Sequence, residues 1–213
     1  MLKVLMPSLN TLVNSEYQAI KTEETERVIS SLLNGLTKVD TPVLLQVSGI
    51  PGSGKSTYCK ANQKPNYLYL SFDKIMVMLK GYNEDLSKYG AEIAFKNYEM
   101  TARVIGYELL NRAISNHYNI MLEHSGTNQA HLELFKNVKN KGYQTAVNFI
   151  VCDTNLAIKR AKERQKEINR HVPETTIRER AENFSNYIKA YQALSVNTNL
   201  YDGANNFALL KKI

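Results

Sequence analysis

The chain has 213 residues, which is enough for one sizeable α/β domain with a full hydrophobic core. Hydrophobic residues make up 43% of it, and no apolar run approaches the roughly eighteen residues that cross a bilayer, so no membrane association is expected. The net charge of +7 favours acidic partners such as nucleotides, nucleic acid or an acidic protein without choosing among them.

The first residues and the cysteines bear on location. The opening Met-Leu-Lys-Val-Leu-Met-Pro is too short in its apolar part for a secretory signal, and no small-residue cleavage site follows it. Cys59 and Cys152 lack the spacing of metal ligands, which favours reduced thiols over a disulfide scaffold. The sequence therefore predicts a cytoplasmic protein.

The N-terminal part has a helical pattern. An approximate apolar stripe predicts a helix over residues 14–38, and Gly35 lies near its end. We expect residues 1–40 to form a helical segment that packs on the core of a domain spanning residues 41–213.

A glycine-rich segment follows a short β-rich apolar run at Pro42–Val47. It reads Gly-Ile-Pro-Gly-Ser-Gly-Lys-Ser-Thr from residue 49 to residue 57, which is the spacing of a phosphate-binding P-loop. Glycines let several backbone N–H groups turn inward around a phosphate, and a helix beginning at Lys55 adds the positive end of its dipole. The Lys55 ammonium is expected to reach the β and γ phosphates, and the Ser56 hydroxyl to ligate Mg²⁺. The residues predicted to bind the nucleotide are Gly49, Gly52, Ser53, Gly54, Lys55, Ser56 and Thr57.

Two acids follow the next two predicted strands. Asp73 comes directly after a strand at Tyr67–Ser71, and Glu123 ends a strand at Asn119–Glu123. Ligands of open α/β sheets bind at the carboxyl ends of the strands, so both carboxylates are expected beside the nucleotide. Asp73 is a candidate base, and Glu123 a candidate to order Mg²⁺ or water. Ordinary structural roles, an N-cap for Asp73 and a strand-end acid for Glu123, are the alternatives.

The remaining pattern alternates helices and strands. Helices are predicted after residue 54 and over residues 92–115, 129–141 and 154–166, with another after Pro173, and strands over residues 144–152 and 200–202. This alternation predicts an α/β fold of the P-loop NTPase type, with a parallel sheet and helices on both of its faces.

Three arginines in the second half of the chain suggest a lid. Arg160 and Arg164 share one face of the predicted helix, and Arg170 falls in the loop that follows. Phosphoryl transfer needs charge neutralisation at the γ phosphate and a base aligned with the acceptor hydroxyl. A closing segment that carries arginines supplies the first, and Asp73 would supply the second. The alternative for each arginine is a solvated basic helix face.

Two other nucleotide or metal functions find little support. The four histidines show no ligand spacing, so a zinc site is not expected. The Asn-Lys-x-Asp motif by which GTPases read the base is also missing, because Asn140-Lys-Gly-Tyr143 stops one acid short, and no Asp-x-x-Gly switch occurs.

The ordered motifs resemble the zeta toxin family over about residues 43 to 202. The resemblance rests on the P-loop, Asp73 at a strand exit, Asn119-Ile-Met-Leu-Glu-His-Ser125, Lys141-Gly-Tyr143 before a strand, and Arg160, Arg164 and Arg170 ahead of His-Val-Pro173. Two positions depart from the family: Glu-Gly-Thr or Glu-Thr-Thr is common where Glu123-His-Ser125 stands, and a Gly is common at Asn169.

The resemblance implies kinase chemistry. Zeta toxins are ATP-dependent kinases that phosphorylate the 3′-hydroxyl of the sugar in UDP-N-acetylglucosamine, and many are held inactive by a small antitoxin. The matching motifs imply that Asp73 is the base, and that Glu123 is a substrate- and metal-site acid with Ser125 beside it. They also imply that Arg160 or Arg164, together with Arg170, binds phosphate.

Two other functions stay open. P-loop polynucleotide kinases share the same base and lid logic, and a chain of charge +7 suits a nucleic-acid end. A regulatory or effector module, in which ATP only shapes a binding surface, belongs to a different class. ATP consumption that depends on an added acceptor would separate the enzymes from this module.

Overall fold

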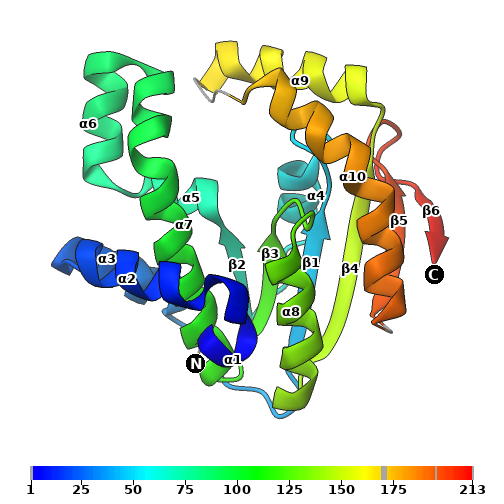
Figure 1. The fold of residues 1–213 in the computed structure, drawn as a ribbon, viewed down its shortest axis with the longest axis horizontal. Coiled ribbons are helices and arrows are strands. Elements are labelled where there is room, and N and C mark those ends of the chain that lie inside the picture. Colours follow the sequence, from blue (N-terminus) through cyan, green and yellow to red (C-terminus); the bar gives the residue numbers. More distant parts are fainter. Residues whose placement is uncertain (1, 169–171, 195, 213) are drawn as a thin grey trace.

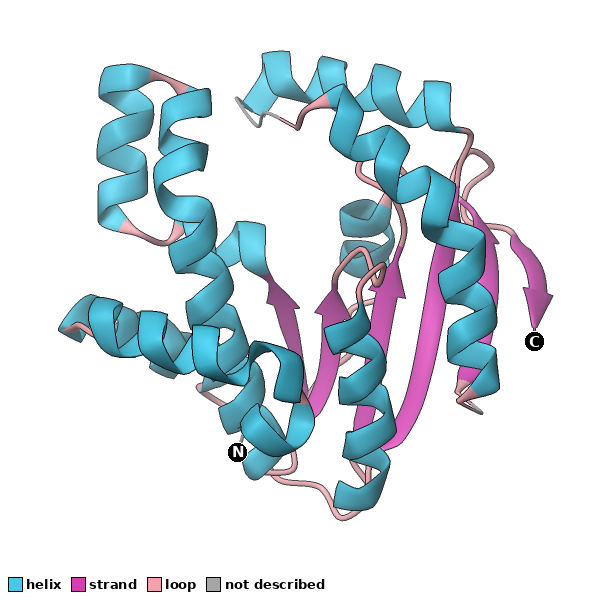
Figure 2. Ribbon diagram, viewed as in Figure 1, coloured by secondary structure: helices cyan, strands magenta, loops and turns pink. Residues whose placement is uncertain are grey.

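A six-stranded sheet forms the centre of the protein. The structure is a computed structural model that describes residues 2–168, 172–194 and 196–212. The strand order is β2-β3-β1-β4-β5-β6. The first five strands run parallel, and β6 runs antiparallel to β5 at one edge (Figure 2). The strands are β1 (Val43–Ser48), β2 (Tyr67–Ser71), β3 (Asn119–Glu123), β4 (Gln144–Val151), β5 (Asn197–Asp202) and β6 (Leu209–Lys212).

Helices cover both faces of this sheet. One face packs against α7, α8 and α10, and α4 lies behind the other (Figure 1). The helices are α1 (Leu2–Leu5), α2 (Asn10–Ile20), α3 (Glu23–Leu33), α4 (Lys55–Ala61), α5 (Phe72–Val77), α6 (Lys80–Tyr89), α7 (Ala91–Ser115), α8 (Gln129–Val138), α9 (Thr154–Ile168) and α10 (Glu174–Ala193). Two short 3₁₀ turns, η1 (Pro7–Leu9) and η2 (Lys139–Lys141), complete the set.

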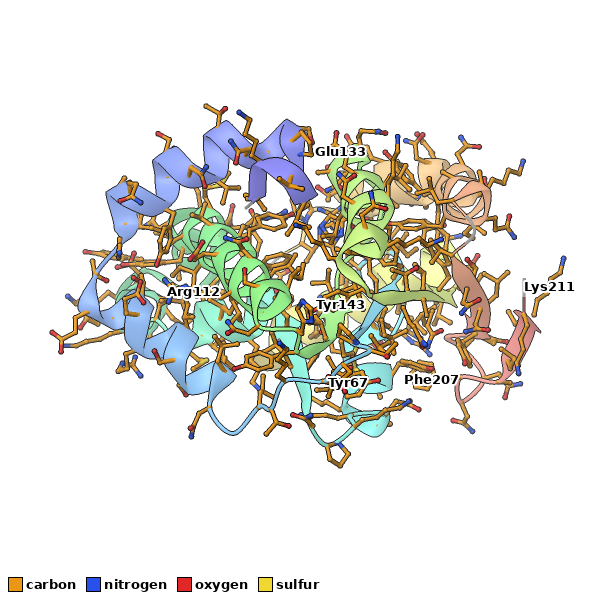
Figure 3. All side chains as sticks on the ribbon, turned by 90° about the horizontal axis from the view of Figure 1, so that it is seen from below. Tyr67, Arg112, Glu133, Tyr143, Phe207 and Lys211 are labelled. Atoms are coloured by element: carbon orange, nitrogen blue, oxygen red, sulfur yellow. The ribbon has the colours of Figure 1, made fainter. Side chains whose placement is uncertain are left out.

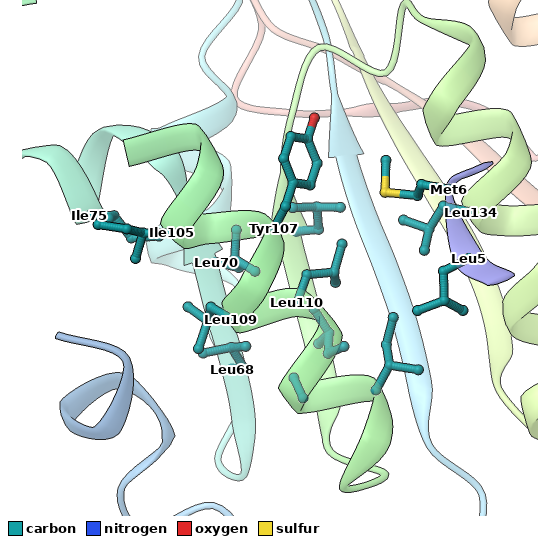
Figure 4. Packing of buried hydrophobic residues seen from close by; sticks show 14 of the residues in the cluster. Leu5, Met6, Leu68, Leu70, Ile75, Ile105, Tyr107, Leu109, Leu110 and Leu134 are labelled. Carbon is teal, nitrogen blue, oxygen red and sulfur yellow. The ribbon is translucent and has the colours of Figure 1, made fainter. Parts of the chain in front are cut away.

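The central strand β1 is buried on both faces, because alternate side chains of a strand point to opposite sides. Leu44 lies in the larger core with α7 and α8, whereas Val47 packs against Tyr58 and Cys59 of α4. Figure 4 shows the larger core, in which Leu109 of α7 lies beside β2. Packing on both faces thus holds the sheet in place, so residues at the carboxyl ends of its strands have defined positions.

The N-terminal helices join this larger core. Leu5 and Met6 are fully buried near α8 (Figure 4). Farther along, Arg112 of α7 forms ion pairs of 2.7 Å with Glu26 of α3 and Glu108 of α7, and it donates to the Tyr17 hydroxyl of α2 at 2.9 Å. Figure 3 labels Arg112 on the side of α7 that faces these helices. The division of the chain at residue 40 stays a prediction.

The predicted fold class is confirmed, with one strand of opposite direction. The single helix predicted over residues 14–38 is wrong, because the chain forms two helices, α2 and α3, with a break at Lys21 and Thr22. Thr22 caps α3: its side chain accepts from the Thr25 N–H at 3.3 Å, and the Thr25 side chain accepts from the Thr22 N–H at 2.9 Å. Such a capping box satisfies two free donors and so stabilises a helix start at this point.

The other differences concern short elements. The helices α5 and α6 and the antiparallel strand β6 were not predicted, and β5 begins at Asn197 rather than Leu200. The helix α6 and part of α7 extend beyond the carboxyl end of β2 (Figure 1). The helices α9 and α10 lie on the other side of the carboxyl edge of the sheet. In the described part of the chain, no helix has the length and apolarity that crossing a membrane requires.

Candidate active site

The P-loop connects β1 to α4 and adopts a conformation that its glycines make possible. Gly54 has φ +101°, in the left-handed region that favours glycine, directly before the first residue of α4. Gly52 has φ +85°, and a Cβ there would lie 2.1 Å from the Ala157 carbonyl oxygen of α9. The loop is therefore both tightly turned and closely covered by α9.

Lys55 is the first residue of α4, and its ammonium folds back over the loop. Its Nζ donates to the carbonyl oxygens of Gly49 at 2.8 Å and Ile50 at 3.0 Å. These bonds place the positive charge at the helix N-terminus, where anions are favoured. A phosphate in the loop would thus meet the ammonium, the helix dipole and the loop N–H groups together.

Glu123 at the end of β3 is held by two hydroxyl groups. Ser56 Oγ donates to Glu123 Oε1 at 2.6 Å, and the Tyr69 hydroxyl of β2 donates to Oε2 at 2.5 Å. Burial and the neighbouring Glu123 carboxylate raise the pKa of Tyr69 well above its usual value, so the phenol keeps the proton that it donates. Glu123 is only 7% exposed, and hydrogen bonds to both of its carboxylate oxygens fix the orientation of the group.

Asp73 lies in the first turn of α5, not in an extended strand exit. Strand pairing puts Ser71 of β2 level with Glu123 of β3, so Asp73 is two residues beyond that level, at the carboxyl edge of the sheet. The residue is half-buried and lines the same cavity as Glu123. The two acids thus line one cavity, Asp73 from the helix that follows β2 and Glu123 from the end of the neighbouring β3, although 50 positions separate them in the sequence.

A cavity of about 780 Å³ gathers most of the predicted residues. Its wall includes Gly52, Gly54, Lys55, Ser56, Thr57, Asp73, Glu123, Ser125, Arg160 and Arg164. Gly49 and Ser53 do not line it, and Ser53 is a buried residue of the loop. Arg170, the third predicted lid arginine, lies outside the described residues.

Arg160 and Arg164, the two predicted lid arginines that the structure describes, differ in their surroundings. Arg160 Nη1 donates to the Gly203 carbonyl at 2.7 Å, which ties α9 to the turn between β5 and β6. The same turn brings Phe207 against the Tyr58 ring of α4, with ring centroids 5.4 Å apart, and Figure 3 labels Phe207 in this region. Arg164, one helical turn after Arg160, lines the cavity. Arg160 therefore has a structural bond in addition to its place in the wall.

Sequence reasoning missed several residues of this wall. Tyr69 lies two residues before Ser71 in β2, so the two side chains point to the same face of the sheet. The strand pattern could therefore have predicted on which face Tyr69 lies. Arg103 on α7 and Arg180 on α10 had no such signal, because they approach the cavity from helices whose packing only the fold defines. Phe95 of α7 adds an aromatic side chain to the part of the wall that α7 contributes.

The donor set near Ser56 fits a magnesium ion. Mg²⁺ prefers oxygen ligands and is usually bound through one or two protein groups, with water and phosphate oxygens completing its shell. The Ser56 hydroxyl and the Glu123 carboxylate are such oxygens and lie 2.6 Å apart. No cluster of three or more His, Cys, Asp or Glu that could hold a metal ion occurs within the described chain.

A scan against protein families decides the relationship of this chain. The zeta toxin model matches residues 29–210. The chain belongs to the zeta toxin family. Its match extends beyond the residues 43 to 202 over which the motifs predicted the resemblance, and it confirms that prediction.

Two solved structures of low sequence identity share the fold. A solved chain from the PezAT chromosomal toxin-antitoxin system of Streptococcus pneumoniae has a TM-score of 0.72 and 18% identity, over 90% of this chain and 81% of that one. A structure of AvrRxo1-ORF1:-ORF2 with ATP has a TM-score of 0.61 and 12% identity, over 97% of this chain and 67% of that one. A search of curated proteins found no match.

These comparisons bear on the reaction at a coarse level. At such low identities the two structural matches show only that the fold is shared. The family match covers most of this chain and shows its family. Together with the P-loop, the family supports ATP binding and an ATP-dependent, kinase-type function.

Proposed function

We propose that this zeta toxin relative transfers the γ-phosphate of ATP to a sugar hydroxyl of a nucleotide sugar such as UDP-N-acetylglucosamine. The observation that carries the proposal is that one cavity is lined by Lys55 of the P-loop, by Asp73 and Glu123, and by Arg160 and Arg164. Positioning and charge neutralisation are what phosphoryl transfer requires of a protein, and these residue types supply both.

Each residue has a role that follows from its place. The loop N–H groups and Lys55 bind the β and γ phosphates, and Ser56 with Glu123 would hold Mg²⁺. The ion, when bound, neutralises charge on the phosphate oxygens. Asp73 accepts the proton of the acceptor hydroxyl as that oxygen attacks the γ phosphorus.

The lid arginines act on the other side of the transferred group. Arg164 lines the cavity from α9 and stabilises the charge on the γ-phosphate oxygens, a role that we also assign to Arg170. Arg160, which is bonded to the Gly203 carbonyl, orders the lid and the adjoining turn as well as facing the nucleotide. Charge-assisted bonds of a planar guanidinium to phosphate are short and directional, which suits this task.

The cavity also suits an anionic acceptor. Arg180 of α10 lines it together with Arg103 of α7, which is ion-paired with Glu99 at 2.7 Å, and Ser125 lies two residues after Glu123 in the same wall. Phe95 offers an apolar face to a ring. A nucleotide sugar presents a diphosphate, a base and a sugar, so it matches cationic and apolar groups in one cavity.

An acceptor comparison tests the proposal. Purified protein is incubated with Mg-ATP and either UDP-N-acetylglucosamine or short oligonucleotides with free 5′-hydroxyls, and acceptor-linked phosphate is detected by mass. We expect a gain of one phosphate on the nucleotide sugar, at its 3′-hydroxyl. A phosphorylated oligonucleotide with an unchanged nucleotide sugar would replace this function by the second candidate.

That second candidate is a polynucleotide or nucleotide kinase. The net charge of +7 favours it, and so do Lys60 and Lys74, which line the cavity in addition to Lys55. Binding of nucleic acid through its phosphates weakens steeply with salt, whereas a small acceptor that touches few groups shows a shallow dependence. A purely regulatory ATP-binding module would consume no ATP with either acceptor.

A small antitoxin is the protein partner that we propose. Support comes from the family and from the likeness to a chain of the PezAT toxin-antitoxin system. Inhibition of acceptor phosphorylation by a co-expressed small protein from the same operon would test this partner directly.

A further inference from the structure

His124 occupies an unusual place between the two substrate-side residues Glu123 and Ser125. Its side chain is 8% exposed and lines the active-site cavity. Its ring lies edge to face against Phe72, which precedes Asp73, with ring centroids 5.8 Å apart. An imidazole is therefore built into the wall beside both acids, where the roles assigned above do not use it.

The hydrogen bonds define which nitrogen of His124 carries the proton. The Gly126 backbone N–H donates to His124 Nδ1 at 3.0 Å, and a backbone N–H is always a donor. Nδ1 must then be the acceptor nitrogen, so the ring hydrogen lies on Nε2. His124 therefore presents an N–H donor and not a second acceptor.

A buried network fixes the orientation of this ring. His124 stacks on His131 of α8 with ring centroids 3.6 Å apart and an interplanar angle of 8°. His131 Nδ1 lies 2.6 Å from Gln46 Oε1, and its Nε2 lies 3.3 Å from the Tyr107 hydroxyl. His131 is fully buried, so the stacking partner itself cannot turn without breaking these bonds.

The direction of the network can be followed from a backbone carbonyl. The Tyr191 hydroxyl donates to the Gly126 carbonyl at 3.3 Å, so it accepts from Gln46 Nε2 at 3.0 Å. This assigns the Gln46 amide and leaves Oε1 to accept from His131 Nδ1. Gly126 thus anchors both ends, because its N–H binds His124 and its carbonyl binds Tyr191.

Nothing in the described chain (residues 2–168, 172–194 and 196–212) accepts a hydrogen bond from His124 Nε2. Nδ1 is engaged by Gly126 and one ring face is covered by His131, so the edge with Nε2 is what the ring offers to the cavity. We propose that His124 is a specificity-determining residue whose Nε2–H donates to an oxygen of the phosphate acceptor next to the reacting hydroxyl. The inference rests on the proposed kinase function and adds a requirement on the acceptor, a carbonyl or hydroxyl oxygen beside the phosphorylated position.

Two substitutions separate this contact from a structural role. His124→Phe keeps a flat ring to stack on His131 but has no donor, whereas His124→Gln keeps an N–H donor and loses the aromatic stack. With UDP-N-acetylglucosamine as acceptor, we expect the acceptor KM to rise about 10-fold in the Phe variant and much less in the Gln variant. The KM for ATP should stay unchanged in both, since neither P-loop nor lid is altered. His117→Asn, at the opposite edge of the sheet before β3, is the matched control.

A second measurement does not depend on turnover. Long-range ¹H–¹⁵N spectra of ¹⁵N-histidine-labelled protein, assigned with the two variants, report the tautomer of each ring. We expect the Nε2–H form for His124 and the Nδ1–H form for His131, and a shift of the His124 Nε2 signal on addition of UDP-N-acetylglucosamine. An Nδ1–H form for His124, or an acceptor KM that is equal in wild type and the Phe variant, would overturn the inference.

The outcomes also distinguish this inference from the proposed function. If the wild type phosphorylates the oligonucleotide and not the nucleotide sugar, the function proposed above fails, and the same comparison of variants is made with the oligonucleotide. A selective rise in that acceptor's KM would still support His124 as the contact. Phosphorylation of neither acceptor, with no shift of the His124 signal on adding either one, would overturn both proposals.

Discussion

Ser56 and Glu123 are joined by a hydrogen bond of 2.6 Å between the Ser56 hydroxyl and Glu123 Oε1. The bond connects the P-loop helix to the end of β3 at the point where the metal of a P-loop kinase is expected. Tyr69 completes the arrangement from β2, with a bond of 2.5 Å to the other carboxylate oxygen. The Glu123 carboxylate of β3 is thus oriented by hydroxyl groups from two other elements, Ser56 of α4 and Tyr69 of β2.

Tyr69→Phe tests whether this orientation of the Glu123 carboxylate matters for metal binding. Loss of the hydroxyl leaves Glu123 Oε2 without its donor, so the carboxylate is less well oriented. Supporting bonds of this kind change metal affinity by about 10- to 100-fold. We expect the Mg²⁺ concentration for half-maximal activity to rise about 10-fold with little change in the maximal rate. Tyr67→Phe on the same strand is the control, and an equal effect there would indicate a general loss of stability.

Lys55→Ala should abolish phosphoryl transfer and leave the fold intact. The ammonium donates to the carbonyl oxygens of Gly49 and Ile50, and its side chain is no part of the hydrophobic core. We expect the rate to fall by about 100-fold or more, as for other groups that stabilise charge in a transition state. Circular dichroism and the melting temperature monitor the fold, and Lys211→Ala on β6 is the matched control. Full activity in a folded variant would move the nucleotide site elsewhere.

Asp73→Asn should reduce turnover far more than ATP affinity. An amide keeps the shape of the side chain but cannot accept the proton of the acceptor hydroxyl, and a positioned base contributes about 100- to 10,000-fold. ATP binding by titration and kcat with a saturating acceptor measure the two effects separately. Asp40→Asn, an exposed residue before β1, serves as the control. A proportional fall in binding and turnover would make Asp73 a nucleotide or metal contact.

Features that depend on local sequence, such as the P-loop, could be predicted without a structure. Glycine positions dictate the loop conformation locally, so the residues from 49 to 57 could be assigned without a structure. The placement of Asp73 and Glu123 at one edge of the sheet could be predicted because each follows or ends a predicted strand, and parallel strands share one carboxyl edge. The break before α3 was also readable, since Thr22 precedes Glu23 and Glu24 as a helix cap does.

Other features depend on contacts between distant residues. β6 has four exposed residues and no alternation of apolar and polar side chains, so it forms only because the edge of β5 is available. The His131 bond to Gln46 spans 85 positions, and neither residue carries a motif. Arg103 belongs to the cavity only because α7 runs past β2. Such relationships are set by packing and not by local pattern.

Arg164→Lys and Arg160→Lys should differ in their consequences. Lysine keeps the charge but loses the planar fork that binds phosphate, so Arg164→Lys should lower kcat by about 10-fold with an unchanged melting temperature. Arg160→Lys also loses the directed bond to the Gly203 carbonyl, so it should lower both kcat and the melting temperature. Arg178→Lys on the outer side of α10 is the control. Unchanged kinetics in both variants would mean that these arginines do not act on the phosphate and that the segment is a solvated basic helix face.

The last prediction concerns the pH dependence of stability that the buried histidine pair imposes. Burial, followed by the positive charge of Arg103, lowers the pKa of His131 to about 3, whereas an unfolded histidine has an ordinary pKa of 6.5. Between these values the unfolded chain binds a proton that the folded chain does not. The free energy of unfolding therefore decreases as the pH falls below about 6.5, by up to about 1.4 kcal/mol per pH unit for this residue.

His131→Gln removes the titrating group and leaves polar atoms that remain able to bond to Gln46. Urea unfolding at pH 7 and pH 5 should show that the loss of stability between the two pH values is smaller in the variant by about 2 kcal/mol, although the variant is less stable than wild type at both. Tyr107→Phe removes the other hydrogen bond of His131 but keeps the histidine, so its stability should fall equally at both pH values. An unchanged pH dependence in His131→Gln would mean that His131 binds a proton in the folded protein as readily as in the unfolded chain.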